Sequence, residues 1–253
     1  DTACTYGDSE RVLGMALPKK HDFRIITKTP VFRKKKISIN DAEKLKSTLI
    51  NSLKNLGQSK VAGLLIHYAE DLFVDGGELL FVAMQELKKK GLIDAIGVSI
   101  STGEQIDVLL EKYDLDIFQL PINILDQRLI YSGHIAKLKK KKVEIHARSV
   151  FLQGLLLIDP ELLHSYFTPI KPLLYEYRNF LSSQCLIPIE GALGFVKGIS
   201  GLDYVIIGVN NLKQLENNLI SFNKSYKDFS FCTIKRFSTN DPKYLNPSLW
   251  KLN

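Results

Sequence analysis

The sequence predicts an α/β fold built on a parallel sheet, because two kinds of segment alternate along the whole chain. Short apolar runs are continuous rather than alternating in polarity, as in strands buried on both faces of a parallel sheet. Between them lie longer stretches in which apolar residues recur at helical spacing. No proline- or serine-rich linker divides residues 1–253, so we expect a single domain, with residues 235–253 as a C-terminal loop or tail.

Six apolar runs are expected to form strands. They are Phe23–Ile26, Val61–Ile66, Ala95–Val98, Ile117–Leu120, Val143–Ile145 and Tyr204–Ile207. A seventh strand should end at Asp1, and a closed barrel would need an eighth upstream of the given sequence. A doubly wound sheet would carry a glycine-rich turn after its first strand, and no G-x-G-x-x-G occurs in the chain. The pattern therefore favours a barrel.

Six further stretches have helical periodicity. They are Asp41–Leu56, Glu78–Lys90, Glu104–Tyr113, Gly133–Lys141, Ala192–Ile199 and Leu212–Phe222. In the first, Leu45, Leu49 and Leu53 fall on one stripe. We predict Asn40 as its N-cap and Gly57 as the residue that stops it.

The net charge of +7 comes from 34 Lys and Arg residues against 27 Asp and Glu residues. Part of the excess lies in two runs, Arg33–Lys36 and Lys139–Lys142. Such runs can bind nucleic acid or acidic membranes. Neither run is interleaved with the aromatic residues that stack on bases. We therefore interpret them as a solvated loop and a solvated helix end, and expect no nucleic-acid or membrane partner.

The cysteines Cys4, Cys185 and Cys232 are odd in number and far apart. They form no disulfide framework and have no zinc-ligand spacing, so we expect no metal site and a cytoplasmic protein. No apolar stretch approaches the ~18 residues that a membrane span needs. The first residues also lack the charged and apolar regions of a signal peptide.

Chemically active side chains stand where the expected strands end, which in a barrel is the rim that carries active sites. Tyr6, a weak acid with a pKa of about 10, can protonate a developing alkoxide if its phenol is made more acidic. A buried ammonium at Lys28 would have that effect, and Asp1 would keep Lys28 charged. A neutral His67 would polarise a carbonyl. Taken singly, each has an ordinary structural explanation, such as a turn tyrosine or a core histidine.

Together these residues resemble a known pattern. The segment Asp1-Thr-Ala-Cys-Thr-Tyr6-Gly-Asp-Ser-Glu10, followed by Leu13-Gly14, resembles the aldo-keto reductase signature D-[TS]-A-x-x-Y-G-x-S-E-x-x-L-G. The resemblance continues in family order through Ile-Thr-Lys28, Leu-Ile-His67, Gly97-Val-Ser99, Gln119-Leu-Pro-Ile-Asn123, Ser149-Val-Phe-Leu-Gln-Gly154, Ile207-Gly208-Val209 and Gln214-Leu-Glu-Asn217-Asn218-Leu219. It implies a (β/α)8 barrel, given from the end of its second strand. We expect the family's hairpin plug and its first strand and helix to precede Asp1.

The resemblance also implies roles for individual residues. Asp1, Tyr6, Lys28 and His67 correspond to the catalytic tetrad, with Tyr6 as the general acid in reduction. Tyr6, His67 and Trp250 would contact the substrate, a small-molecule carbonyl compound. The residues that would bind the cofactor are Ser99 and Gln119 at the nicotinamide, Arg148, Ser149, Phe151, Leu152 and Gly154 along the nicotinamide and pyrophosphate, and Gly208, Asn210, Gln214 and Asn218 at the adenosine phosphate.

The chain departs from the family pattern around the cofactor. Ile100 replaces an Asn and cannot hydrogen-bond the carboxamide, and Arg148 stands where an aromatic ring often stacks. Val209 replaces a Ser or Thr, Gln214 an Arg, and Asn217 a Glu. Because Arg is the natural partner of a 2′-phosphate, we expect NADP(H) with only a modest preference over NAD(H).

Two functions follow from these observations. The first is NAD(P)H-dependent reduction of an aldehyde or ketone on a small polar metabolite. The loop that contains Ser149 is similar to relatives in bacterial carbohydrate metabolism, which suggests a sugar derivative. The second is a catalytically weak regulatory or scaffolding subunit that binds the cofactor. The intact tetrad favours the enzyme, and a monomer or a small homo-oligomer is compatible with either.

Overall fold

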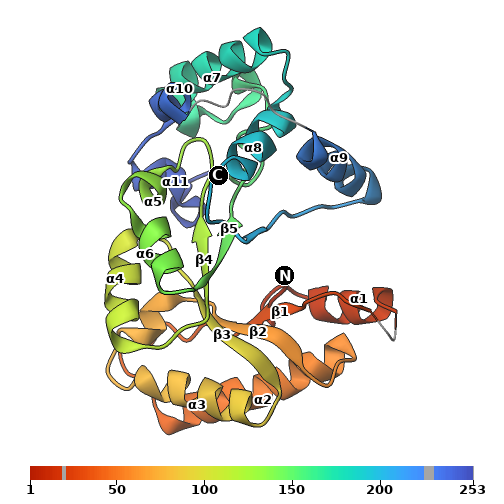
Figure 1. Ribbon diagram of the computed structural model, residues 1–253, viewed down its shortest axis with the longest axis vertical. Helices are drawn as coiled ribbons and strands as arrows, with labels where there is room; N and C mark the ends of the chain where they lie inside the picture. The colour runs from red at the N-terminus through yellow and green to blue at the C-terminus, as the bar shows by residue number, and fades with distance from the viewer. Residues whose placement is uncertain (19–20, 225–230, 253) are drawn as a thin grey trace. The chain divides into compact units, whose positions relative to one another are not determined.

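The computed structural model describes residues 1–18, 21–224 and 231–252, and these fall into two compact units (Figure 1). Unit 1 comprises Asp1–Leu120 and Lys140–Glu144, and unit 2 comprises Pro121–Lys139 and Ile145–Asn253. The expectation of a single domain stays a prediction.

Unit 1 alternates strands and helices. Its elements are α1 (Ser9–Ala16), β1 (Ile26–Lys28), α2 (Ile39–Leu56), β2 (Val61–Ile66), the 3-10 helix η1 (Ala69–Leu72), α3 (Glu78–Lys89), β3 (Ile93–Ser99), α4 (Gly103–Lys112) and β4 (Ile117–Pro121). Each strand pairs in parallel with the next, so that Thr27 lies opposite Leu64 and Val98 opposite Phe118. Helices α2 and α3 lie side by side along this sheet (Figure 1).

The centre of this sheet is packed closely enough to require glycine. A Cβ atom added at Gly97 would lie 2.4 Å from Leu65 Cδ2 and 2.6 Å from Ile117 O. Leu65 and Ile117 are themselves buried and form a core cluster with Ile26. The strands are therefore held in a fixed register, and this register determines where their ends lie.

Unit 2 contains the remaining elements. They are α5 (Arg128–Tyr131), α6 (His134–Lys140), β5 (Glu144–Arg148), η2 (Pro160–Leu162), η3 (Ser165–Ile170), α7 (Lys171–Ser183), α8 (Pro188–Lys197), β6 (Tyr204–Val205), α9 (Leu212–Asn223), α10 (Phe231–Ile234), η4 (Lys235–Phe237), α11 (Pro242–Leu245) and η5 (Pro247–Leu249). Strands β5 and β6 pair in parallel, with His146 opposite Tyr204.

The predicted α/β class is confirmed, since every strand pairing described is parallel and helices stand between the strands. The described residues contain six strands. This is the strand and helix order of a (β/α)8 fold without the closed ring of eight strands. Among the described residues, no helix combines the length and apolarity needed to cross a membrane.

Several predicted boundaries were wrong. Strand β6 ends at Val205, so Gly208 lies three residues beyond the strand and not at its end. Helix α7 was not predicted; it begins with Pro172 in its first turn and buries Leu174, Tyr177 and Leu181. The predicted tail forms short helical turns rather than a plain loop, and its last residue, Asn253, lies outside the described residues.

The basic runs carry ion pairs. Lys34 pairs with Asp41 at 2.5 Å and Lys36 with Asp75 at 2.7 Å. In the second run, Lys139 pairs with Asp203 at 2.8 Å. These contacts fit the interpretation of the runs as surface features, since carboxylates of the same chain already neutralise part of their charge.

The N-terminus of α2 is fixed by Ser38 and not by the predicted Asn40. Ser38 has extended backbone angles, and its carbonyl oxygen accepts from the Asp41 amide at 3.0 Å. The Asp41 carboxylate in turn accepts from the amide of Ser38 at 3.0 Å and from its hydroxyl at 2.8 Å. The Lys34 ammonium, hydrogen-bonded to Asp41, lowers the pKa of this carboxyl group below its ordinary value. At the other end Gly57, with φ of 63°, stops the helix as predicted.

We expect Asp41→Asn to lower the free energy of unfolding by about 1 kcal/mol, the usual value of a helix cap. Because the carboxyl pKa is lower in the folded state, its stabilisation is present above the unfolded pKa of about 4 and is lost as the pH falls through the folded pKa. Urea unfolding of both proteins at neutral pH and near pH ~3 tests this. Their difference should shrink in acid, while Glu43→Gln on the same helix should change little at either pH. An equal loss at both pH values would contradict the assignment.

Candidate active site

A buried ion pair stands at the end of β1. The Lys28 side chain is 1% exposed, and its ammonium donates to Asp1 Oδ2 at 2.6 Å and to the carbonyl oxygen of Thr2 at 2.9 Å. The amide of Thr2 donates to Ile26 O at 2.9 Å. This bond holds Asp1 beside β1.

Tyr6 lies on the turn that leads into α1. Its amide donates to Ala3 O at 3.0 Å, and Gly7 follows with φ of 54°. The Lys28 ammonium lies 5.0 Å from the centroid of the Tyr6 ring. The Tyr6 side chain is 48% exposed. A phenol that is both close to a buried cation and open to solvent can donate a proton to a bound molecule.

His67 follows the last residue of β2. Its ring meets the Tyr6 ring edge-on, with centroids 5.6 Å apart and planes at 84°. Nδ1 of His67 lies 3.2 Å from Thr5 Oγ1, and the backbone amide of His67 donates to Thr29 Oγ1 at 3.2 Å. The structure therefore brings the four residues of the predicted tetrad together within unit 1.

Gln119 makes a contact that the sequence did not predict. It is buried in β4, and its Nε2 donates to Asp1 Oδ1 at 2.9 Å. Ser99 lies opposite Gln119 in the strand register, at the end of β3. Ile100 is fully buried, and its amide donates to Gln119 O. Within unit 1, the amide nitrogen of Gln119 thus supports the ion pair of Asp1, and the predicted contact of Gln119 with the nicotinamide stays a prediction.

Two supporting residues were not anticipated. Glu10 is buried on α1 and accepts from Thr27 Oγ1 at 2.7 Å, which ties the helix to β1. The Thr2 and Ser9 hydroxyls lie 2.9 Å apart and tie the same turn. Both residues, Ser9 and Glu10, belong to the opening motif. The motif shows their positions, but only the folded structure shows their hydrogen-bond partners.

In unit 2, the loop after β5 has an unusual backbone. Ser149, Leu152 and Gln153 have φ of 60°, 46° and 53°, and Gly154 has 85°. Non-glycine residues seldom adopt such angles, and consecutive ones turn amide groups towards a common point. Leu152 is fully buried and fixes the loop.

The amide groups of this loop can serve an anion. Those of Phe151 and Gln153 donate to no group among the described residues. Asn123 Nδ2 donates to Ser149 O at 3.1 Å, and Arg148 Nη1 donates to Ser149 Oγ at 3.0 Å. The loop thus fits the pyrophosphate of a nicotinamide cofactor, because such concave runs of amides bind phosphate groups.

The beginning of α9 is a second place for a phosphate. Asn211 caps the helix by accepting from the Gln214 amide at 2.9 Å, and Gln214 Oε1 accepts from the Asn210 amide at 2.7 Å. The side chain of Gln214 is therefore folded back onto its own turn. The N-terminus of a helix still offers positive potential to a phosphate.

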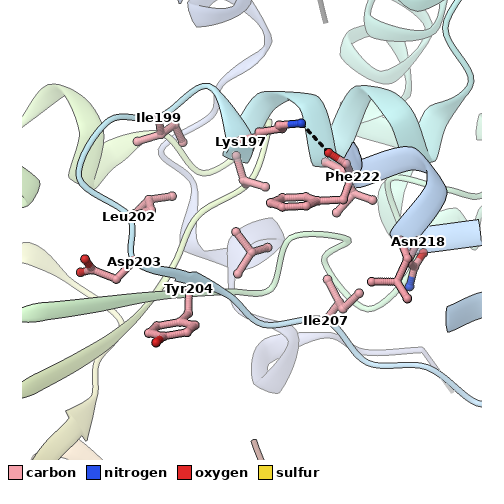
Figure 2. A pocket seen from close by; sticks show the side chains of 12 residues that line it. Lys197, Ile199, Leu202, Asp203, Tyr204, Ile207, Asn218 and Phe222 are labelled. Atoms are coloured by element: carbon pink, nitrogen blue, oxygen red, sulfur yellow. Dashed lines mark hydrogen bonds between the residues drawn. The ribbon is translucent and has the colours of Figure 1, made fainter. Parts of the chain in front are cut away.

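Asn218 and Trp250 lie in other surroundings. Asn218 is buried and lines a cavity of about 370 Å³, together with the apolar side chains of Ile207, Leu219 and Phe222 (Figure 2). Lys197, at the end of α8, donates to Phe222 O at 2.7 Å across one side of this cavity. Trp250 donates through Nε1 to Tyr244 O. The predicted contacts of Asn218 and Trp250 with cofactor and substrate stay predictions.

Within the part of the chain that the structure describes, no group of three or more His, Cys, Asp and Glu side chains could hold a metal ion.

A parallel β/α fold with polar side chains after its strands is the arrangement of an enzyme whose active site lies at the ends of the strands. The aldo/keto reductase family model matches residues 1–238, and the chain belongs to this family. The holo form of an aldo-keto reductase from Bacillus halodurans has 18% sequence identity to this chain and a TM-score of 0.73, and the match covers 99% of this chain and 83% of that one. A thermostable aldo-keto reductase in complex with the inhibitor epalrestat has 20% identity and a TM-score of 0.70, with 94% and 81% covered. No protein of the curated set matches.

Family membership confirms the resemblance and implies NAD(P)H-dependent carbonyl reduction of a small-molecule substrate. The solved structures are under a quarter identical to this chain and support its fold alone.

Cys4 reports on the environment of the site. Burial raises the pKa of its thiol to about 11, and the negative charge of Glu10 adds to the effect. We expect iodoacetamide to modify Cys4 far more slowly than the exposed Cys185 at pH ~8, because only the thiolate reacts. The rate at Cys4 should rise up to about pH 11, and Glu10→Gln should increase it. Peptide mapping by mass spectrometry measures both rates, and equal rates at pH ~8 would contradict the buried, acidic surroundings.

Proposed function

We propose that the protein reduces an aldehyde or ketone on a small polar metabolite, with Tyr6 as the general acid. The observation that carries this proposal is the buried Lys28–Asp1 pair, whose ammonium lies 5.0 Å from the Tyr6 ring centroid. A bound nicotinamide would supply the hydride. The Lys28 ammonium would stabilise the negative charge that develops on the Tyr6 oxygen as its proton is transferred.

His67 orients the carbonyl group in this proposal. If the Thr5 hydroxyl donates to Nδ1, the hydrogen of the neutral ring resides on Nε2, where it can be donated to the substrate oxygen. Tyr6 and His67 would then share one oxygen atom, and Asp1 would keep Lys28 charged through the reaction. We assign the same neutral role to His67 in both directions of the reaction.

For the cofactor, we assign the amide groups of the Ser149–Gly154 loop to the pyrophosphate and the start of α9, with Asn210 and Gln214, to the adenosine phosphate. Ser99 remains our candidate for the nicotinamide carboxamide. A sugar derivative is the substrate class we favour, and the cationic Arg148 favours an acidic one. The widely spaced cysteines support a cytoplasmic setting.

The second candidate, a cofactor-binding regulatory or scaffolding subunit, is favoured by one observation. The amide nitrogen of Gln119 already donates to Asp1, and Ile100 is buried and apolar. The nicotinamide carboxamide would therefore have fewer hydrogen-bond partners than in the family pattern. Cofactor binding without turnover of any carbonyl compound would establish this alternative.

We expect Tyr6→Phe to lower kcat by about a hundredfold or more, the value of a general acid, with nearly unchanged cofactor affinity. Turnover of a panel of sugar aldehydes and aromatic aldehydes with NADPH, followed by absorbance, provides the measurement. Tyr131→Phe, outside the site, is the matched control. Full activity of Tyr6→Phe would remove Tyr6 from the mechanism.

We expect the protein to bind NADPH more tightly than NADH by about one to two orders of magnitude at most. One charged contact to a phosphate contributes roughly 1.5–3 kcal/mol, and Gln214 has no charge. Gln214→Arg should increase the preference for NADPH, while Lys213→Gln should reduce it. Fluorescence titration with both cofactors measures the ratio of their affinities. A preference for NADPH beyond about a thousandfold in the unmodified protein would show that another side chain binds the 2′-phosphate.

A further inference from the structure

A second cavity, of about 280 Å³, lies in unit 2 between the α5 segment and the C-terminal segment. It is lined by Gln127, Arg128, Tyr131, Lys235, Ser238 and Asn240. None of these residues belongs to the candidate active site. A water molecule takes about 30 Å³ in the liquid, so the cavity has room for roughly nine groups of that size.

The lining contains one buried acceptor with no partner. Gln127 is 1% exposed, and its Nε2 donates to Ile124 O at 2.7 Å and to Ile234 O at 3.0 Å. Those two carbonyl groups fix the orientation of the amide, because an oxygen in that place would meet two other oxygens. Its Oε1 accepts no hydrogen bond among the described residues. A buried acceptor without a partner is costly, so it indicates a donor that the site normally receives.

The same cavity has a positive rim. The Lys235 ammonium lies 4.6 Å from the centroid of the Tyr131 ring, which holds it at the edge of the cavity. Arg128 adds a guanidinium, of which Nε and Nη2 are bonded to the buried carboxylate of Asp126 at 2.8 Å. Because that carboxylate offsets the charge of Arg128, Lys235 supplies the net positive charge.

We propose that this cavity binds a small hydroxylated anion, with the anionic group at Lys235 and a hydroxyl donating to Gln127 Oε1. The backbone keeps the two sides together, because Thr239 N donates to Leu125 O at 2.9 Å. The Ser238 hydroxyl is bonded to Lys235 O at 2.7 Å and fixes the turn that carries the ammonium. A phosphorylated or carboxylated polyol of about ten heavy atoms satisfies both the charge and the buried acceptor.

Calorimetric titration with glycerol 3-phosphate, inorganic phosphate and glycerol tests the proposal. We expect glycerol 3-phosphate to bind about threefold to tenfold more tightly than phosphate, from one added hydrogen bond, and glycerol to bind weakest. Lys235→Met should weaken glycerol 3-phosphate about tenfold or more. Lys243→Met is the matched control, since Lys243 also lies over aromatic rings, those of Tyr166 and Tyr244, but outside the cavity. It should leave the affinity within about twofold.

Three outcomes would overturn the proposal. They are no binding of glycerol 3-phosphate at about 10 mM, an equal loss in the Lys235 and Lys243 variants, and complete displacement by saturating NADP⁺, which would assign the anion to the cofactor site. Gln127→Leu should abolish the preference for glycerol 3-phosphate over phosphate. If that variant does not fold, the side-chain amide resonance of Gln127 in the unmodified protein replaces it: a shift with glycerol 3-phosphate that exceeds the shift with phosphate supports the site, and no shift refutes it.

Discussion

The buried ammonium of Lys28 is the constraint on which the rest of unit 1 depends. Removing an ammonium from water costs several kcal/mol, and the cost is offset only if its hydrogen bonds are well made. Asp1 and Thr2 O accept from Lys28, and Gln119 in turn donates to Asp1. The ends of β1 and β4 and the segment before α1 must therefore meet at one point. Loss of one partner would leave a buried charge without a hydrogen bond. The contacts that hold the Lys28 ammonium beside the Tyr6 ring therefore also stabilise this part of the fold.

Much of the fold could be predicted because burial on both faces of a parallel strand leaves an uninterrupted apolar run. Strand β2 was predicted residue for residue, and Gly57 was identified as the stop of α2 from its position alone. The errors occur where tertiary contacts decide. Ser38 is the N-cap instead of Asn40 because the Asp41 carboxylate accepts from both the amide and the hydroxyl of Ser38. Helix α7 was not predicted because its buried stripe is short and partly aromatic. Strand β6 ends at Val205 although Ile206 and Ile207 are still apolar and the Ile206 amide still donates to Ala147 O.

In the candidate site, too, some features could be predicted from the sequence and others depend on tertiary contacts. The opening motif predicted Asp1 and Tyr6, and the segments Ile-Thr-Lys28 and Leu-Ile-His67 predicted the other two residues. Sequence alone does not identify the hydrogen-bond partners of these residues, because hydrogen bonds are chosen among neighbours that only the folded chain defines. Thr5 at His67 Nδ1 is one example, and Gln119 at Asp1 is another.

The loop after β5 in unit 2 has a strained backbone, with positive φ at Ser149, Leu152 and Gln153. Each non-glycine residue at a positive φ costs of order 1 kcal/mol, so a loop keeps several only when surrounding contacts impose them. Here the buried Leu152 and the bond from Asn123 to Ser149 O impose them. Amide groups aligned in this way before an anion binds would reduce the entropy lost on binding. At α9 the side chain of Gln214 orders the turn by accepting from the Asn210 amide, so affinity for a phosphate there would come in part from prearranged backbone.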